Sequence, residues 1–505
     1  MSYKKYQKKI ISAKSLVKKK LKNFVLCHGV FDLVHPGHLR HFFHAKEKAK
    51  ILVVSITSDQ YINKGVYRPF VNEKLRSLNL AALEVVDFVI INDNPDALPL
   101  LKKLKPNFFA KGFDYSSRSN KKTLAEEQLL SSYGGELIFT PGNVMFSSSN
   151  FIDEKKINLD VEKIEFLLKE KKITLNELET TVEKFKNIQT TVVGDTIVDQ
   201  QIYCHHTITQ NKTPTLNLSY EHNKKFVGGA AIVARHIRAA GAKVKFISFS
   251  GKDSDSSFVV KELNKDKIQN TIFTHSKRIT NLKQSIYSKK YNLLKISKTN
   301  KENLSQIELA DLVRELKKIK SGILLFSDFR HGIFDSTTIP ILCKNIKKNI
   351  IKIADSQVAT RWGNIADFKN FDLIAPNENE ARFATSDQDS NISSLSRKLF
   401  KISNCKNLIL KLGENGALCV KKNHNKYESY LLPSMVSKLV DPIGSGDALL
   451  AYSSLAFAIT KCHARAGLIG TIAAACKIEV QGNMPVKKKD VINKIRKLKT
   501  ELNLN

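Results

Sequence analysis

The chain alternates short apolar runs with longer amphipathic stretches, and this alternation fixes the class of fold. In its first part, residues 23–28, 51–56 and 86–91 are predicted strands, and residues 38–48 and 72–83 are predicted helices. Strands separated by helices build βαβ units, whose parallel sheet is buried on both faces. We therefore expect an α/β domain with a buried parallel sheet.

A second series of the same kind begins at residues 190–194. Further strands are predicted at 243–248, 323–326, 350–354, 373–375 and 408–410, and helices at 228–240, 446–460 and 464–478. Two short runs, 285–287 and 293–296, indicate a small antiparallel piece. Because 505 residues are too many for one ordinary core, we expect two α/β domains.

These patterns divide the chain into segments. Residues 1–22 are Lys-rich and are expected to form a basic N-terminal extension. The first domain is expected at 23–152 and the second at 190–505. Between them, residues 153–189 are highly charged and carry apolar residues at helical spacing, which predicts a helical linker.

The net charge of +34, from 82 basic and 48 acidic residues, would attract anions. The lysines are spread over the whole chain, with no Arg-rich arm and no basic motif interleaved with aromatic residues. This distribution favours phosphorylated substrates over nucleic acid as the anionic partner. A steep salt dependence of duplex binding would indicate the nucleic-acid role instead.

Cysteine usage and hydropathy bear on the compartment. The seven cysteines are scattered and form no Cys-x-x-Cys pair, which is typical of reduced thiols in a cytosol. No apolar run approaches the roughly 20 residues that cross a bilayer, and the Lys-rich start lacks the apolar core of an export signal. We expect a cytoplasmic protein with no membrane partner.

The first predicted strand runs into Gly29-Val-Phe31-Asp and then into His35-Pro-Gly-His38. Pro suits the first turn of a helix, where no backbone donor is required. His35 and His38 are three residues apart, so their imidazoles can lie on one side of that turn. A helix N-terminus adds free N–H groups and positive potential, which favours a phosphate site.

With its neighbours, this segment resembles the cytidylyltransferase-type nucleotidyltransferases, whose fold is Rossmann-like. The likeness covers nearly all of residues 23–152 and includes Ser55-Ile-Thr-Ser-Asp59, Lys64-Gly65, Glu73-x-x-Arg76, Lys111-Gly-Phe-Asp-Tyr115 and Ser147-Ser-Ser149. It implies a reaction in which a sugar phosphate attacks the α-phosphate of a nucleoside triphosphate and pyrophosphate leaves. Mg²⁺ is expected with the triphosphate.

The same resemblance implies the roles of individual residues. His35 and His38 would steady the α-phosphate in the transition state, and Lys64 would neutralise phosphate charge. The implied nucleotide-binding residues are Gly29, Phe31, Lys111, Ser148 and Ser149. Lys111 could equally be an ordinary lysine at a strand end. Positioning and charge neutralisation suffice for this chemistry, so no protein nucleophile is required.

A second strand-to-helix junction reads Asp441-Pro-Ile-Gly444-Ser-Gly446-Asp447 and precedes an apolar helix. Two glycines before a helix expose consecutive N–H groups, which can form a nest for an anion. Asp447 stands at the helix start, where a carboxylate can accept a hydroxyl proton during phosphoryl transfer. An Asp at that place can also be a simple helix cap.

This junction and its company resemble the ribokinase-type (phosphofructokinase-B) sugar kinases. The likeness covers residues 190–490 and includes Val193-Gly-Asp195, Gly228-Gly229-Ala, Gly251-x-Asp253, Asn377-Glu-x-Glu380, Leu412-Gly413-Glu-x-Gly416 and Gly482-Asn-x-Pro485. It implies a ribokinase-like α/β domain with a small β lid. Asp447 would be the catalytic base, and ATP or another nucleoside triphosphate the phosphate donor.

The implied binding residues fall into two groups. Nucleotide would be bound by Asn377, Glu380, Gly413, Gly416, Gly444 and Gly446, and the sugar by Asp195, Asp199, Gly228, Gly229 and Lys283. Glu380 would also organise Mg²⁺ indirectly.

The sequence departs from the kinase pattern on the sugar side. Ile232 stands where an Asn usually follows the glycine motif, and Lys283 is followed by Gln284 and Ser285 in place of a Lys-x-Arg pair. One missing polar contact can change specificity greatly. The sugar is therefore left open, as is a kinase-like module that binds sugar without catalysis.

The pair of domains resembles the bifunctional heptose-phosphate kinase/heptose-1-phosphate adenylyltransferases of lipopolysaccharide precursor synthesis, in which the kinase comes first. Here the order is reversed. The resulting hypothesis is phosphorylation of a sugar phosphate followed by nucleotidyl transfer to a sugar 1-phosphate, giving an ADP-heptose-like product. A glycerol-phosphate-type cytidylyltransferase fused to another sugar kinase is the alternative. The oligomeric state is left open, with a homodimer as the candidate.

Overall fold

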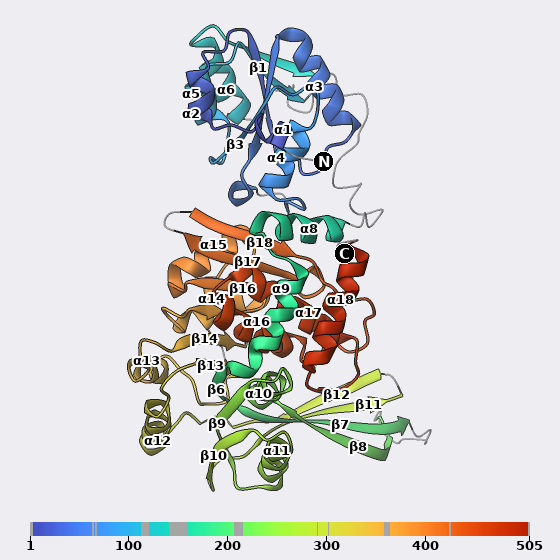
Figure 1. Ribbon diagram of the computed structural model, residues 1–505, viewed down its shortest axis with the longest axis vertical. Coiled ribbons are helices and arrows are strands. Elements are labelled where there is room, and N and C mark those ends of the chain that lie inside the picture. The colour runs from blue at the N-terminus through green and yellow to red at the C-terminus, as the bar shows by residue number, and fades with distance from the viewer. Residues whose placement is uncertain are drawn as a thin grey trace. The chain divides into compact units, whose positions relative to one another are not determined.

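The computed structural model describes residues 4–62, 65, 68–112, 121–140, 159–206, 216–289, 291–300, 302–357, 364–423 and 426–502. The chain divides into two compact units, one built mainly from residues before Leu159 and the other from later residues (Figure 1). Each unit contains parallel strands with helices between them. The expected fold class, two α/β domains, is confirmed.

The sheet of the first unit has, among the described residues, the strand order β3-β2-β1-β4-β5, and all its pairs are parallel. The strands are β1 Phe24–Gly29, β2 Ile51–Thr57, β3 Phe88–Asn92, β4 Phe108–Gly112 and β5 Glu136–Thr140. The connecting helices are α3 Pro36–Lys48, α4 Glu73–Ala81, α5 Leu98–Leu104 and α6 Lys121–Ser131. Apolar cores lie on both faces of β1, as a doubly covered sheet requires.

The described part of the basic segment, residues 4–22, packs against this unit. It contains α1 Lys4–Gln7 and α2 Ala13–Lys18, and Leu16 is buried with residues of α5. Ile11 N donates to Val89 O at 2.9 Å, and Val89 N donates to Lys9 O at 2.9 Å. The segment thus covers the open edge of β3, which would otherwise expose unpaired backbone groups. Most lysines of the segment are exposed, whereas Leu16 is buried. Composition alone does not reveal this division.

The second unit has a long mixed sheet, whose described strands follow the order β10-β9-β6-β13-β14-β15-β16-β17-β18. The strands are β6 Gln189–Gly194, β9 Lys243–Gly251, β10 Gln269–His275, β13 Ile323–Asp328, β14 Ile351–Ser356, β15 Leu373–Ile374, β16 Asn407–Lys411, β17 Ala417–Asn423 and β18 Lys426–Leu432. Pairs from β10 to β16 are parallel, whereas β16, β17 and β18 pair antiparallel.

Helices cover this sheet. They include α10 Gly229–Ala239, α11 Ser254–Lys265, α12 Gln306–Lys317, α13 Thr338–Lys344, α14 Glu378–Thr385, α15 Ile392–Ser403, α16 Ser445–Thr460, α17 His463–Ile478 and α18 Lys488–Glu501. Helices α10, α16 and α17 consist almost wholly of buried small and apolar residues, so they form the centre of the core. No helix in the described ranges has both the length and the hydropathy that a membrane span requires.

Four further described strands form a separate sheet, called the lid below, which combines parallel and antiparallel pairs. Its order is β12-β11-β7-β8, from β7 Thr196–His206, β8 Leu218–Gly228, β11 Asn281–Ser288 and β12 Tyr291–Lys298. The expected small antiparallel piece is confirmed as β11 and β12. The hairpin of β7 and β8 was not anticipated, because β8 carries a run of exposed polar residues that breaks the apolar pattern.

The charged segment expected as a linker is helical, but its helices belong to the second unit. They are α8 Leu159–Lys171 and α9 Leu175–Glu183, and their apolar residues lie in the main core of that unit. Helix α9 starts with a capping box in which Thr174 and Glu177 satisfy each other's backbone N–H. The many charges of this segment form the outer face of amphipathic helices.

Candidate active sites

The two histidines of the first motif lie together at the N-terminus of α3. His35 is the N-cap residue, and its Nδ1 accepts a hydrogen bond of 3.2 Å from Gly37 N. The rings of His35 and His38 are stacked, with centroids 3.8 Å apart. Burial lowers the pKa of His35, so the neutral imidazole is favoured near pH 7. The next N–H groups of the helix start are used locally, since His38 N and Leu39 N both donate to His35 O, at 2.8 and 3.2 Å.

Gly29 and Phe31 form the wall behind these rings. The ring of Phe31 meets that of His38 edge-on, with centroids 5.0 Å apart. A Cβ at Gly29 would lie 3.1 Å from Phe31 Cε2, so a larger residue would push the phenyl ring toward the histidines. The end of β1 and the start of α3 therefore form one packed corner.

The structure places Lys111 in an internal ion pair. Its ammonium group donates to the Glu126 carboxylate and, at 3.1 Å, to Thr123 Oγ1. Both partners lie on α6, so this lysine ties the end of β4 to that helix. Its nucleotide role stays a prediction. Lys64, Ser148 and Ser149 lie outside the described residues.

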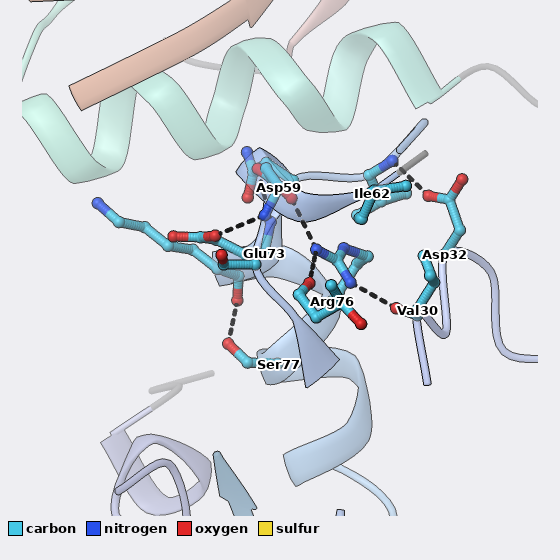
Figure 2. A network of polar contacts seen from close by, with 12 residues as sticks. Val30, Asp32, Asp59, Ile62, Glu73, Arg76 and Ser77 are labelled. Carbon is cyan, nitrogen blue, oxygen red and sulfur yellow. Dashed lines mark hydrogen bonds and ion pairs between the residues drawn. The ribbon is translucent and has the colours of Figure 1, made fainter. Parts of the chain in front are cut away.

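Figure 2 shows a buried arginine that joins two strand ends near this corner. Arg76, on α4, has no exposed surface and donates to Val30 O, to Thr57 O at 2.8 Å and to Asp59 Oδ1 at 2.6 Å. Asp59 and Glu73 accept each other's backbone N–H, at 2.9 and 3.1 Å. The turns after β1 and β2 are thereby locked to α4.

Asp32 fixes the stretch that precedes α4. Its carboxylate accepts backbone N–H groups of Phe70 and Val71, both at 2.8 Å, and the guanidinium of Arg68 at 3.1 Å. The sequence alone indicates no role for Asp32 or for Arg76 of the Glu73-x-x-Arg76 motif. The signal for Asp32 was a carboxylate directly after a strand, where parallel sheets gather their site residues.

In the second unit, the junction before α16 is held in a fixed turn. Asp441 accepts from Ile443 N at 3.0 Å and from Gly482 N at 2.9 Å. Gly444 has φ +78°, a left-handed conformation in which a Cβ would collide with Asn483 Oδ1. Ser445 N donates to Pro442 O at 3.2 Å within this turn, and Asp447 lies in the first turn of α16.

Buried charges surround Asp447. Lys411 Nζ forms an ion pair of 2.7 Å with Asp355 Oδ2, and a Cβ at Gly446 would lie 3.7 Å from Lys411 Nζ. Burial and the nearby Asp355 carboxylate raise the pKa of Asp447 to about 7. Burial alone would lower the pKa of Lys411, but Asp355 and Glu380 raise it. Lys411 was missed by sequence reasoning, although it directly precedes the glycine loop at 412–416.

Asn377 and Glu380 form a reciprocal cap at the start of α14. Glu380 accepts from Asn377 N and Asn377 Nδ2, both at 2.6 Å, and Glu380 N donates to Asn377 Oδ1 at 2.8 Å. Burial and the Asp355 carboxylate raise the pKa of Glu380 to about 8, against the effect of Lys411. This carboxyl group and Asp447 thus belong to one electrostatic cluster.

The predicted sugar residues divide into two sets. Asp199 on β7 and Lys283 on β11 are register partners, and Asp199 Oδ2 accepts from Asn483 Nδ2 at 3.3 Å. A Cβ at Gly228 would collide with the Asp199 carboxylate, so this glycine makes room for it. Asp195 and Gly229 lie deeper. The buried Asp195 accepts from the backbone N–H of Phe329 at 2.9 Å and of His331 at 3.2 Å, which ties it to a loop.

Gly413 and Gly416 form the turn between β16 and β17. Both have positive φ, +59° and +84°, and a Cβ at Gly416 would collide with Leu432 O. A Cβ at Gly413 would meet no atom within 4 Å, so that side of the turn is open. A nucleotide contact at Gly413 stays a prediction.

A comparison with protein families decides the relationship of the second unit. The model of the pfkB family carbohydrate kinases matches residues 187–489, more than half of the chain. The chain belongs to the pfkB carbohydrate kinase family. The cytidylyltransferase-like family matches residues 26–152, so a nucleotidyltransferase-like domain precedes the pfkB domain.

Curated relatives match the chain in part. The bifunctional protein HldE of Geotalea uraniireducens is 34% identical over 145 residues, which is 28% of this chain and 27% of that protein. HldE of Campylobacter fetus is 39% identical over 117 residues, 22% of this chain and 26% of that protein. The chain therefore spans about a quarter of the length of these relatives.

Solved structures resemble the pfkB domain in fold. Phosphofructokinase-2 from Escherichia coli in complex with substrates and products aligns with a TM-score of 0.52 and 17% identity, over 62% of this chain and 99% of that one. The same enzyme in complex with fructose-6-phosphate aligns with a TM-score of 0.51 and 16% identity over the same shares. At such identities the likeness shows the fold alone.

The two departures from the pfkB pattern, at Ile232 and at Gln284-Ser285, differ in burial. Ile232 is fully buried in α10, close to Gly228 and Gly229 in the chain. On β11, Gln284 Nε2 donates to Gln200 Oε1 of β7 at 2.9 Å, and Ser285 follows it on the same strand. These positions therefore carry an aliphatic side chain and a glutamine amide followed by a serine hydroxyl where the family pattern has an amide and a guanidinium.

Proposed function

We propose that the chain couples two transfer reactions of activated-sugar synthesis. The pfkB domain phosphorylates a sugar phosphate of the heptose 7-phosphate type with ATP. Another enzyme must remove the extra phosphate of the resulting bisphosphate. The first domain then transfers a nucleotidyl group from a nucleoside triphosphate to the sugar 1-phosphate and releases pyrophosphate. The observation that carries the proposal is the placement of Asp447 at the N-terminus of α16, beside the buried Lys411 and Asp355.

In the kinase step, Asp447 accepts the proton of the sugar hydroxyl as its oxygen attacks the γ-phosphate. A carboxyl pKa near 7 leaves a large fraction of this group ionised at neutral pH, so it can serve as a base. The backbone N–H groups at Gly444–Gly446 and the Lys411 ammonium stabilise the negative charge of the phosphate in transit. Asp199 and Lys283 orient the sugar from the lid.

In the nucleotidyl transfer, the stacked His35 and His38 steady the α-phosphate. The dipole of α3 adds positive potential at the same place. Arg76 and Asp32 hold the surrounding turns in place. The two histidines then act through positioning and charge stabilisation, without a covalent intermediate. Lys64, Ser148 and Ser149 complete this proposed site by their resemblance to the family motifs.

Mg²⁺ fits the residues of the kinase site. Asp355 Oδ1 is buried and has no hydrogen-bond partner among the described residues, and Glu380 lies in the same charged cluster. Hard carboxylate oxygens of this kind suit Mg²⁺, which is usually held by one or two carboxylates and by substrate phosphates. The described residues include no group of three or more side chains for a metal site of the protein's own. Bound Mg²⁺ would neutralise charge on the phosphates.

A second candidate concerns the first domain only. The cytidylyltransferase-like match covers residues 26–152 without identifying an acceptor, which leaves glycerol phosphate with CTP as the alternative substrates. Pyrophosphate release from CTP, ATP and GTP, each with sugar 1-phosphates or glycerol phosphate, separates the candidates.

Two further features support the setting of these reactions. All seven cysteines lie in the described ranges and none is paired, which supports a reducing, cytoplasmic location.

Lid strand β12 lies at a sheet edge and exposes Tyr291, Leu294 and Ile296, which supports a homodimer through this edge. Light scattering of the purified chain, and of a Leu294→Lys variant, tests the dimer.

The principal test uses the purified chain with ATP, Mg²⁺ and a panel of phosphosugars that includes heptose 7-phosphate. We expect the wild type to form the sugar bisphosphate and the Asp447→Asn variant to form none. Inertness toward every phosphosugar, with sugar affinity kept in both proteins, would favour a kinase-like binding module instead.

A further inference from the structure

A buried lysine that belongs to none of the motifs described above lies beside the turn that leads into α16. Lys477, in the last turn of α17, has only 1% of its surface exposed. Its ammonium nitrogen has no hydrogen-bond partner among the described residues. An ammonium group that is removed from water without a partner is costly, so its position calls for a reason.

The side chain of Lys477 reaches the turn that carries the phosphate-binding backbone. A Cβ placed on Gly444 would lie 3.6 Å from Lys477 Cε. The same turn rests on the end of α17, since the N–H groups of Val440 and Asp441 both donate to Ile478 O, at 3.1 and 2.9 Å. Lys477 therefore ends directly behind the N-terminus of α16.

A second unsatisfied atom marks the same spot. Asn483 Oδ1 is buried without a hydrogen-bond partner in the described chain, and it is the atom nearest to a Cβ at Gly444. Burial lowers the pKa of Lys477, and the carboxylates of Asp441 and Asp447, at the two ends of the turn, act against this and favour its protonated form.

Another buried lysine of the same unit provides the contrast. Lys494, on α18, is 9% exposed and is fully partnered, with its ammonium 2.5 Å from Glu479 Oε1 and 3.0 Å from Ser437 Oγ. That arrangement stabilises a structure, because the buried charge is paired. Lys477 lacks such a pair, and the place its charge serves is the helix N-terminus.

We propose that Lys477 is a positioning residue of the kinase site, whose ammonium group supplies a fixed positive charge behind the Gly444–Asp447 turn and strengthens its hold on the phosphate in transit. The inference rests on the proposed kinase function. The charge adds to the N–H groups and to the helix dipole, which also favour an anion at this point. Lys411 lies on the strand side of the same turn, so the two lysines flank it from different elements.

The first test compares Lys477→Met with Lys494→Met in the full chain. For Lys477→Met we expect an unchanged or higher Tm, because a costly buried charge is removed, together with a kinase kcat lowered roughly tenfold or more. For Lys494→Met we expect a lower Tm and an unchanged kcat. A lowered Tm in Lys477→Met, or an unchanged kcat, would overturn the inference.

Chemical rescue separates charge from packing. Lys477→Ala leaves space for a small amine, so added methylammonium is expected to restore part of the kcat, with little effect on the wild type or on Lys494→Ala. Tetramethylammonium, which is too large and donates no hydrogen bond, serves as the ionic-strength control. Equal responses to both salts would contradict the proposed charge.

A binding measurement keeps the inference separate from the proposed function. Amide hydrogen exchange of residues 440–447 is followed with Mg²⁺ and either ADP or a non-hydrolysable ATP analogue. In the wild type the triphosphate is expected to protect this turn more than the diphosphate does, and Lys477→Met is expected to lose most of that difference. Protection without phosphorylation of any sugar would refute the kinase reaction alone. Equal protection in the variant would refute the role of Lys477 alone, and a wild type without protection would refute both.

Discussion

Lys411 and Asp355 form an ion pair of 2.7 Å at the carboxyl ends of two strands, β16 and β14, with 12% and 5% of their side chains exposed. Carboxyl ends of parallel strands are where α/β folds place their ligands. The pair leaves Asp355 Oδ1 unpartnered in the described structure and sets the charge around Asp447. In the proposed kinase site, three carboxyl groups, Asp355, Glu380 and Asp447, therefore interact with the charge of Lys411.

Replacement of Lys411 by Met should upset that balance. The carboxyl groups would lose their nearest cation, so the bound triphosphate would be repelled, and we expect kinase kcat/KM to fall roughly a hundredfold. Pyrophosphate release by the first domain should not change. Lys406→Met is the matched control, because Lys406 pairs with Asp372 at the surface with 71% of its side chain exposed. Equal losses in both variants would count against the assigned site.

The raised pKa of Asp447 predicts a pH dependence of the kinase. The base must be ionised, so kinase kcat/KM should fall tenfold per pH unit below about pH 7 and level off above it. Asp447→Asn should lose roughly 10²–10⁴-fold in rate and the acid limb with it. A wild-type profile that stays flat down to pH 5 would exclude Asp447 as the base.

The same shift has a consequence for stability. A carboxyl group whose pKa is raised on folding opposes the folded state at every pH above its unfolded value, and this penalty grows from about pH 4 to about pH 7. Asp447→Asn should therefore raise Tm at pH 8 and raise it less at pH 5. Calorimetry at the two pH values measures the difference, and a Tm gain that is larger at pH 5 would contradict the assignment.

The stacked imidazoles predict a loss confined to the first reaction. His38→Asn should reduce pyrophosphate release roughly 10²–10³-fold, since a group that stabilises transition-state charge is removed, and should leave the kinase rate unchanged. His44→Asn is the control on the same helix, where His44 lies 3.5 Å from Glu47 and away from the helix start. A similar loss in both variants would point to damage of α3 in general.

The buried contacts of Arg76 predict a large contribution to the free energy of unfolding of the first domain. Its guanidinium binds Asp59 and two backbone carbonyl groups while fully buried, so Arg76→Met leaves a carboxylate without its cation. Breaking a buried pair in this way costs about 3–5 kcal/mol. Denaturant unfolding should show that loss in the first domain, whereas Arg40→Met on the exposed side of α3 should stay within about 0.5 kcal/mol of the wild type.

The sequence predicted best where one physical rule decides the outcome. Strands such as β1 and β13 were predictable because a parallel strand that is buried on both faces must be apolar along its length. The junctions at His35 and Asp447 were found because special residues mark a turn into a helix. The β7–β8 hairpin gave no such signal, since residues 221–224 in β8 read Glu-His-Asn-Lys and are exposed.

The high lysine content was the main reason why the remaining site residues could not be predicted from the sequence. In a chain with 82 basic residues, a buried functional lysine has the same local sequence context as a solvated one. Lys411 and Lys477 differ from the surface lysines only through tertiary burial, which no local pattern records. The same bias led to the prediction of a basic N-terminal extension at residues 1–22, whereas Leu16 and its apolar neighbours in the described part pack into the first unit.

That segment gives the last prediction. Leu16 and Val17 are neighbours on α2, but Leu16 is 2% exposed in the core of the first unit and Val17 is 46% exposed. Leu16→Ala should therefore lower the free energy of unfolding of the first domain by about 2–5 kcal/mol, whereas Val17→Ala should change it by less than about 0.5 kcal/mol. Pyrophosphate release should lose heat resistance only in the Leu16 variant, because the edge of β3 loses its cover. Equal stabilities of the two variants would show that residues 1–22 do form a separate extension.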